Sequence, residues 1–387
     1  MAQKHTRRFN LSILAAGSLT LAVLTMAGCG GGSSSAPIKI GMAAPLTGNG
    51  ASFGISQRNA VQLAMAEINS GGGISGRQLQ LLVEDTKTEP PVAVTAVNKL
   101  IYQDKVPVLI GSAASLDVPA YMEMLEKAHV AQILPVAVLP KITESHLKWT
   151  FRNALNDKIA AAKMAEFAYN TLGARKIALL IEDSAFGSTG LRFAERLKEL
   201  GVEPLTVERF TRGQIDFGPQ LLRIRSFGAT HIQFWGYYAD YAQVARKLKE
   251  LNMKVQLMGN QAPVTNKTIE LGGDAVEGAI NICLFVPTSE EPAAKAFVQK
   301  YKTEYGEVPD TWAAESYDGM RILAQALRVA GAEDPLKIRD ALAATKDFKG
   351  LTGTISFNKD GDAEFKETFV TKIEGGRFVP FKMAASH

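Results

Sequence analysis

Residues 38–73 read IKIGMAAPLTGNGASFGISQRNAVQLAMAEINSGGG and contain the two patterns that decide the fold. Residues 38–43 form an apolar run of strand length, and residues 53–69 carry apolar side chains at three-and-four spacing, as in a helix. The helix pattern stops at residues 69–73 (NSGGG), which tolerate the left-handed conformation that often ends a helix. The stretch therefore predicts a strand followed directly by a helix.

The same alternation continues along the chain and predicts a parallel sheet flanked by helices. Further strands are predicted at 79–84, 106–111, 131–135, 177–182, 231–235 and 255–258. Further helices are predicted at 90–103, 118–127, 159–172, 189–200 and 238–252. Near the C-terminus, antiparallel strands are predicted at 354–357, 364–374 and 377–381, with turns at 358–362 and 375–376.

Residues 1–28 have the features of a secretory signal. Three basic residues within the first eight precede an apolar run from residue 11 to residue 27, and small residues lead to Cys29. Polar residues interrupt the run, whereas a spanning helix needs about 18 or more uninterrupted apolar residues. An exported protein is therefore predicted, and a retained transmembrane anchor is the alternative.

The end of this segment, Met26-Ala27-Gly28-Cys29, resembles the bacterial lipobox, with Met26 where leucine is usual. That resemblance implies cleavage before Cys29 and acylation of the cysteine, and several acyl chains anchor a protein stably where one does not. Residues 29–37 are then the lipidated cysteine and a flexible Gly/Ser tether. Plain secretion with a free cysteine is the alternative.

The composition is that of a globular protein. The 387 residues are 46% hydrophobic, 21% charged and 8% aromatic, which excludes collagen-like, disordered and disulfide-scaffold classes. The formal net charge is +4, and removal of Lys4, Arg7 and Arg8 with the signal lowers it to +1, so no nucleic-acid partner is predicted. The second cysteine, Cys283, lies in the apolar run 279–286 and is predicted to be buried and unpaired.

Two motif-like patterns have a simpler structural explanation. Residues 71–76 (GGGISG) fit G-x-G-x-x-G, but they close a helix and lead into a strand, which is the reverse of a dinucleotide site. The alternating polar residues 358–364 begin a calcium-loop pattern that lacks its glycine and its final glutamate. The histidines are scattered, and no G-x-S-x-G, H-E-x-x-H or Walker pattern occurs. We therefore expect no enzymatic activity, no metal and no cofactor.

No single short segment of the chain identifies a protein family, but the order and spacing of several segments together do. They are residues 38–48, Phe53-Gly54, residues 66–74, Glu84-Asp85, residues 98–100, residues 108–111, Tyr237-Tyr238, residues 257–259 and residues 272–278. On these segments the chain, over residues 38–381, resembles the periplasmic leucine/isoleucine/valine-binding family of ABC transporters.

The resemblance implies an α/β fold with two doubly wound parallel-sheet lobes joined by a three-crossover hinge, that of a type I periplasmic binding protein. By that pattern lobe 1 comprises 38–153 plus 286–357, and lobe 2 comprises 154–285 plus 358–387. The ligand is then trapped when the lobes close, at the carboxyl ends of the parallel strands.

The resemblance also implies which residues face the ligand. Phe53 and Tyr237 match aromatic cleft residues, and Ser115 matches a serine whose hydroxyl and amide receive the ligand carboxylate. Val138 stands where a threonine hydroxyl usually completes the carboxylate site, and its backbone amide remains a possible donor; Val136 belongs to the same predicted wall. For Ser115, an N-cap of the helix near residue 118 is the rival role.

Gln261 stands where the family usually has a glutamate that pairs with the ligand ammonium. Burying an ammonium without a carboxylate partner costs about 3–5 kcal/mol, so the sequence disfavours leucine and other zwitterions unless another group compensates. Asp157, Asp240 or Asp183 could do so, and a helix cap or a surface charge is the alternative for each. Trp235, at a position that is usually small, either lines the pocket or belongs to the core.

We expect a non-catalytic, lipid-anchored, monomeric solute-binding protein of the periplasm. Its predicted ligand is a small polar or carboxylate molecule, either of branched-chain amino acid type or a related organic acid or amide. Its predicted partners are an ABC permease and, through the lipid anchor, the membrane. The alternative is the ligand-sensing receptor domain of a signalling assembly, which a fused transmembrane and signalling region would favour.

Overall fold

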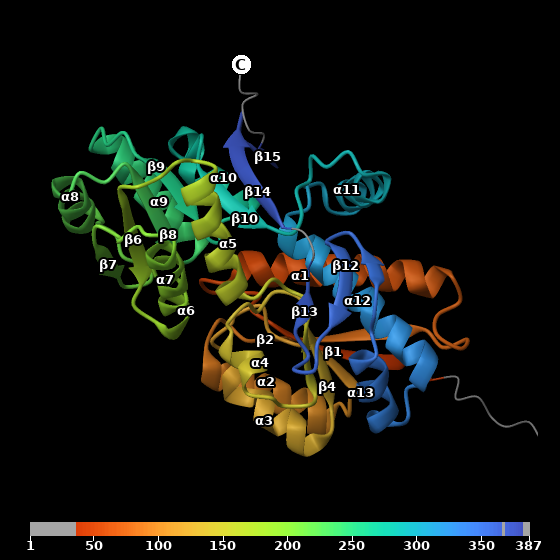
Figure 1. Ribbon diagram of the computed structural model, residues 1–387. Helices are drawn as coiled ribbons and strands as arrows, with labels where there is room; N and C mark the ends of the chain where they lie inside the picture. Colours follow the sequence, from red (N-terminus) through yellow and green to blue (C-terminus); the bar gives the residue numbers. More distant parts are fainter. Residues whose placement is uncertain (1–35, 366–367, 382–387) are drawn as a thin grey trace, which may run out of the picture. The chain divides into compact units, whose positions relative to one another are not determined.

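The computed structural model describes residues 36–365 and 368–381, which form two lobes, each built on a mainly parallel sheet (Figure 1). The predicted signal, Cys29 and the tether up to residue 35 lie outside the described residues. In the first sheet the strand order is β2-β1-β3-β4-β5, and all neighbours are parallel. Its strands are β1 Ile38–Ala44, β2 Leu79–Asp85, β3 Val108–Ile110, β4 Ala131–Leu134 and β5 Thr150–Arg152.

The second sheet repeats this order and adds two strands at one edge. Its parallel part runs β10-β9-β8-β6-β7, and β14 and β15 continue it antiparallel beyond β10. These strands are β6 Ile177–Glu182, β7 Val207–Phe210, β8 His231–Trp235, β9 Gln256–Gly259, β10 Ile280–Cys283, β14 Phe369–Glu374 and β15 Arg377–Pro380.

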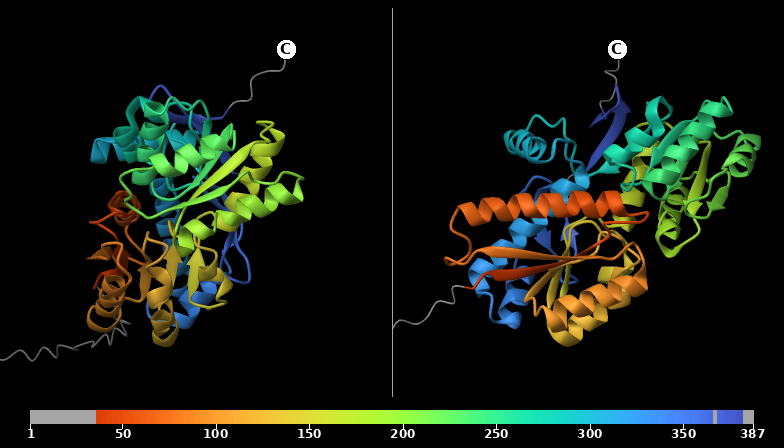
Figure 2. Two further views of the ribbon diagram at one scale, coloured as in Figure 1. Left: turned by 90° about the vertical axis from the view of Figure 1, so that its left-hand side faces the viewer. Right: turned by 180° about the vertical axis from the view of Figure 1, so that it is seen from behind.

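Helices cover both faces of each parallel sheet (Figure 2). The first lobe contains α1 Ala51–Ser70, α2 Pro90–Asn98, the π-helix η1 Lys99–Gln103, α3 Val118–Ala128, α4 Lys141–Glu144, α11 Pro292–Tyr305, α12 Thr311–Ala330 and α13 Pro335–Ala343. The second contains α5 Asp157–Asn170, α6 Ala185–Ser188, α7 Leu191–Glu199, α8 Gly218–Ser226, α9 Tyr238–Glu250, α10 Asn266–Gly272 and the 3-10 helix η2 Gly273–Val276.

The apolar strand runs are buried on both faces because each sheet has two cores. In β1, Ile40 and Met42 pack with α1 and α12 on one face, while Ala43 packs with α2 and α3 on the other. In β6, Leu179 joins the core under α5 and α7, and Leu180 joins the core under α8 and α9. This two-sided burial explains why these strands are continuous apolar runs rather than alternating ones.

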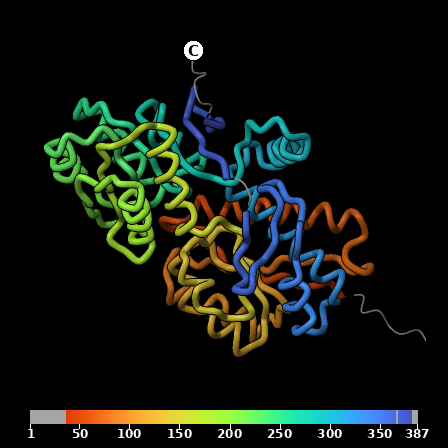
Figure 3. Tube along the Cα trace, in the orientation of Figure 1, coloured from red at the N-terminus to blue at the C-terminus, as the bar shows by residue number. Residues whose placement is uncertain are grey.

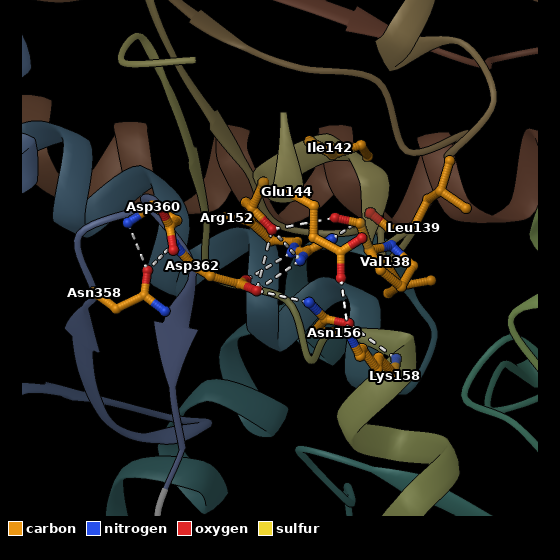
Figure 4. Close-up of polar contacts among 12 residues, drawn as sticks. Val138, Leu139, Ile142, Glu144, Arg152, Asn156, Lys158, Asn358, Asp360 and Asp362 are labelled. Carbon is orange, nitrogen blue, oxygen red and sulfur yellow. Dashed lines mark hydrogen bonds and ion pairs between the residues drawn. The ribbon is translucent and has the colours of Figure 1, made fainter. Parts of the chain in front are cut away.

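The chain passes between the lobes three times, after β5, after β10 and after β13, as the trace in Figure 3 shows. A small antiparallel sheet, consisting of β11 Phe348–Gly350, β12 Gly353–Phe357 and β13 Ala363–Glu364, precedes the last passage. Asp362 lies just before β13 and binds the buried side chain of Arg152. Arg152 Nε donates to Asp362 Oδ1 at 2.8 Å, and Arg152 Nη2 donates to Asp362 Oδ2 at 2.7 Å (Figure 4). Asn156 Nδ2 also donates to Asp362, at 2.7 Å.

The structure confirms the predicted α/β architecture, with each predicted parallel strand present to within two residues at its ends. The predicted single strand 364–374 is wrong, because its start pairs with β12 and its end pairs with β10 and β15. The lobe boundaries stay a proposal, and the pairing of β13 with β12 favours a last crossover after Glu364 rather than after residue 357. Cys283 is buried and unpaired, as predicted.

Candidate functional site

Both parallel sheets have the same doubly wound topology, so each has one point where the chain leaves neighbouring strands in opposite directions. Ligands bind at such switch points, outside the carboxyl ends of the strands. In the first lobe the switch point lies between β1 and β3, and in the second between β6 and β8. The segments that follow these four strands are therefore the natural place for a site.

A small cavity lies where those segments meet, and its walls come from both lobes. It is lined by Phe53, Ala113, Ser115, Val136, Val138, Phe186, Tyr237, Ala262 and Trp312. All of them except Trp312, which is in the first turn of α12, follow the carboxyl end of a parallel strand. The cavity volume is about 10 Å³, which is room for about one water molecule.

Aromatic rings from both lobes contact one another at the cavity. The Phe53 ring meets the rings of Tyr237, Tyr238 and Trp312 edge-on, at centroid distances of 5.3, 5.2 and 5.6 Å. Phe186 packs against the Tyr237 ring in the same way, at 5.2 Å. None of the nine lining side chains is charged, so the walls suit an apolar body that carries a few polar groups.

Ser115 and Val138 lie together in the wall of the first lobe. The Ser115 Oγ atom accepts a hydrogen bond from the Val138 backbone N–H at 3.0 Å. The Val138 amide is therefore occupied, whereas the Ser115 hydroxyl proton can be donated to a ligand. The N-cap of α3 is Asp117, and no side chain caps that helix, so the N-cap interpretation of Ser115 is wrong.

Asp157 and Trp235 contact each other beside the cavity rather than lining it. The N-cap of α5 is Asn156, and Asp157 is the first residue of the helix. Asp157 Oδ2 accepts from Trp235 Nε1 at 3.2 Å and from Thr189 Oγ1 at 3.0 Å, while its Oδ1 has no partner among the described residues. Burial raises the pKa of Asp157 to about 7, and these two hydrogen bonds oppose the rise.

Gln261 is fully buried and precedes the lining residue Ala262 in the sequence. Its Nε2 donates to the Leu155 carbonyl oxygen at 2.9 Å, which fixes the orientation of the amide. Its Oε1 accepts from no group in the described part of the chain. The side chain thus presents a buried, unused acceptor at the position where the resemblance implies contact with the ligand amine.

The other two aspartates considered for that role have different surroundings. Asp183 is exposed and pairs with Arg209 at 3.2 Å. Asp240 is buried and accepts from the Gly213 N–H at 2.9 Å, and burial raises its pKa to about 6. Asp183 therefore fits the surface-charge interpretation, and Asp240 holds the loop after β7.

Sequence reasoning missed a charged pair that supports Tyr237. The Arg212 guanidinium lies 4.0 Å from the centroid of the Tyr237 ring and donates to both oxygens of buried Glu182, at 2.7 and 3.1 Å. It also missed four lining residues: Ala113, Phe186, Ala262 and Trp312. The Asp310 N-cap, which accepts from the Ala313 N–H at 2.9 Å, was a sequence signal for the helix that carries Trp312.

Comparisons with known proteins bear on the family and the fold of the chain. Residues 37–377 match the sequence model of the periplasmic binding protein family, which confirms the resemblance predicted from the sequence. The chain is 29% identical to a protein of Pseudomonas aeruginosa named amino acid binding protein, over 87% of this chain and 90% of the relative. In the part of the chain that the structure describes, no helix is long and apolar enough to cross a bilayer.

Solved structures have the same fold. A leucine-binding protein, LivK, from Thermotoga maritima is 29% identical with a TM-score of 0.82, covering 89% of this chain and 98% of that one. The branched-chain amino acid binding protein LivJ of Streptococcus pneumoniae, in complex with isoleucine, is 28% identical with a TM-score of 0.83, covering 88% and 97%.

Proposed function

Because the chain belongs to the periplasmic binding protein family, we propose that it captures a small amino acid or a related organic acid or amide between its lobes and delivers it to an ABC permease. The cavity at the two switch points carries this proposal, because both lobes contribute to one uncharged, largely aromatic wall. The relatives named for amino acids, and the isoleucine in the pneumococcal structure, support this ligand class.

The walls suggest how a ligand is held. Its apolar body packs against Phe53, Phe186 and Tyr237, and burial of apolar surface contributes about 25 cal/mol per Å². A carboxylate or amide oxygen of the ligand accepts a hydrogen bond from the Ser115 hydroxyl. The Ser115 oxygen itself accepts from the Val138 N–H, so its proton is free to be donated to the ligand. Closure of the lobes then excludes water from these contacts.

The test is a thermal-shift screen of the purified protein with amino acids, their deaminated acids and their amides, followed by calorimetry of the compounds that bind. A bound compound raises the melting temperature by mass action. Ser115→Ala is expected to weaken the tightest compound by about 1–3 kcal/mol, because it removes a donor to a buried polar group. Absence of binding across the whole screen would contradict the proposal.

We propose further that the protein is a lipoprotein anchored through Cys29, which lies outside the described residues. The Met26-Ala27-Gly28-Cys29 ending and the Gly/Ser stretch after it support this proposal. Cys29→Ser is expected to abolish acylation and to prevent signal removal at this site. Mass spectrometry of the wild-type N-terminus checks it, and an unmodified N-terminus at another residue would disprove lipidation.

A further inference from the structure

We infer that Thr265 is a latch residue, which holds lobe 2 against lobe 1 through contacts outside the cavity and so sets how long a ligand stays bound. The inference rests on the proposed function and deepens it, because it assigns ligand retention to residues that do not line the cavity. Thr265 lies between β9 and α10 of lobe 2, three residues after the lining residue Ala262. Its contacts in lobe 1 are Ser52 and Asp310.

The Thr265 hydroxyl hydrogen-bonds to both of these residues. Thr265 Oγ1 lies 2.9 Å from Ser52 Oγ, in the first turn of α1. Burial raises the pKa of Asp310 to about 6, and a hydrogen bond with the Thr265 side chain is among the contacts that oppose this rise. An ionised carboxylate only accepts, so Thr265 donates to Asp310 and its oxygen accepts from Ser52. Water competes little for these bonds, because Thr265 is buried.

Asp310 fixes the lobe 1 side of the latch. It is the N-cap of α12, and its Oδ1 accepts from the Ala313 N–H at 2.9 Å. Its Oδ2 accepts from Ser56 Oγ of α1 at 2.9 Å, so the carboxylate ties the two helices together. Ser52 lies one helical turn before Ser56 and therefore shares this face of α1. All of these bonds lie within lobe 1, so they hold the docking position without help from lobe 2.

Thr265 departs from the usual behaviour of a residue at its position. It is the N-cap of α10, where a threonine side chain normally accepts from an N–H in the first turn of its own helix. The Thr265 side chain makes no such bond, and its hydroxyl is used between the lobes instead. A local rule is thus broken in favour of a contact that exists only when the lobes are together.

A second contact between the lobes lies beside the first. Asn266 follows Thr265, and its Nδ2 donates to the Val308 carbonyl oxygen at 2.7 Å. Val308 stands two residues before Asp310, so the same two segments are joined twice. The Asn266 contact is exposed and open to competition from water, whereas the Thr265 hydroxyl is buried. Thr265 is therefore the residue whose loss should be felt.

The position of the latch determines its effect on binding. A contact that forms on closure and does not touch the ligand stabilises every closed complex by the same factor. A residue that lines the cavity instead changes the relative affinities of different compounds. Thr265 is therefore expected to slow the dissociation of all ligands equally and to select none of them.

The experiment measures association and dissociation rates by stopped-flow tryptophan fluorescence at pH 8, where Asp310 is ionised. Trp312 lines the cavity and serves as the reporter. The probes are leucine, 4-methylpentanoate and 4-methylpentanamide, or the same three derivatives of the side chain that binds best in the screen. Thr265→Val keeps the size of the side chain and removes its hydroxyl. It should raise the dissociation rate of each compound that binds by one common factor, about three- to tenfold, and leave association within about twofold.

The matched control is Thr268→Val, one turn further along α10. Thr268 is fully buried, and its Oγ1 has no hydrogen-bond partner among the residues that the structure describes. Both rates should therefore stay within about twofold of the wild type. Ser52→Ala tests the same contact from lobe 1, and it serves alone if Thr265→Val unfolds. The double variant should dissociate little faster than either single variant, because both remove one shared bond.

Three results would overturn the inference and leave the proposed function intact. They are unchanged dissociation in Thr265→Val and Ser52→Ala, a factor that differs between compounds by more than about threefold, and fully additive effects in the double variant. An equal change in Thr268→Val would likewise show that the hydroxyl acts on α10 rather than between the lobes. If no compound of the whole screen binds to the wild type, the inference and the proposed function both fail.

Discussion

The Asp157 side chain illustrates how a buried carboxyl reduces the stability of the ligand-free protein. The carboxyl is fully buried, and burial raises its pKa from 3.8 to about 7. The folded state therefore holds the proton more tightly than the unfolded state, and the free energy of unfolding falls as the pH rises from about 4 to about 7. A neutral residue of the same shape would avoid this loss.

We therefore predict that Asp157→Asn stabilises the ligand-free protein relative to the wild type, by an amount that grows as the pH rises from about 4 to about 7 and then levels off. Between pH 5 and pH 8 the difference in unfolding free energy between variant and wild type should shift by about 1–3 kcal/mol in favour of the variant. Urea denaturation at both pH values measures it. A difference that is the same at pH 5 and pH 8 would show that the carboxyl is ionised throughout and that its pKa is not raised.

Part of the site was predicted through the resemblance to the family, and the residues concerned lie after strand ends. Phe53, Ser115 and Tyr237 each follow a predicted strand within ten residues, and the structure brings all three to one cavity. Trp312 was not predictable in this way, because it reaches the cavity through the packing of α12 on α1. Asp157 is surrounded by three segments that are distant from it in the sequence, so the local sequence pattern does not predict that it is buried.

At the scale of elements, most strands that form apolar runs were predictable, including the edge strand β2, whereas β5 and β7 were not. The strand β6 is an uninterrupted apolar run because it is buried on both faces. By contrast β7, Val207–Phe210, is an edge strand with exposed and charged residues, and β5 has three residues ending in a charged arginine. Strand propensity predicts such segments poorly, because their pairing with neighbouring strands determines whether they form strands.

The Arg152–Asp362 pair joins elements that no local pattern connects, and it yields a second prediction. Asp362 also accepts from Asn156, the N-cap of α5, so it links the last strand of the first sheet to the first helix of lobe 2 (Figure 4). Asp362→Ala leaves the fully buried Arg152 guanidinium without its counter-ion. We expect it to lower the unfolding free energy by about 3–5 kcal/mol, measured by urea denaturation at pH 7.

A matched control lies two residues away in the same turn. Asp360 pairs with His146, whose side chain is 69% exposed, at 2.8 Å. Asp360→Ala should cost less than about 1 kcal/mol, because exposed pairs contribute little. Equal losses in the two variants would show that the burial of Arg152 does not determine the effect.

At the scale of the whole molecule, the size of the cavity requires motion. Its volume of about 10 Å³ is far below the roughly 300–1,000 Å³ of typical ligand pockets. The walls meet directly, for example where Phe53 of lobe 1 contacts Tyr237 of lobe 2. Entry of a ligand therefore requires the walls to separate, and we expect lobe 2 to move away from lobe 1 by bending of the passages after β5 and β10.

The ligand is expected to favour the closed arrangement, because only that arrangement lets both lobes contact it at once. In its absence the ring contacts of Phe53 help to hold the cavity walls together, and each such pair is worth only about 0.5–1.5 kcal/mol. Small-angle X-ray scattering should thus show a larger radius of gyration for the free protein than for the protein saturated with the tightest compound from the screen. Phe53→Ala should increase the radius of the free protein and reduce affinity, since it removes contacts that exist only when the lobes are closed. If the radius is unchanged at saturation, in both the wild type and the variant, the lobes do not close on the ligand, and it must enter by local movement of the cavity walls.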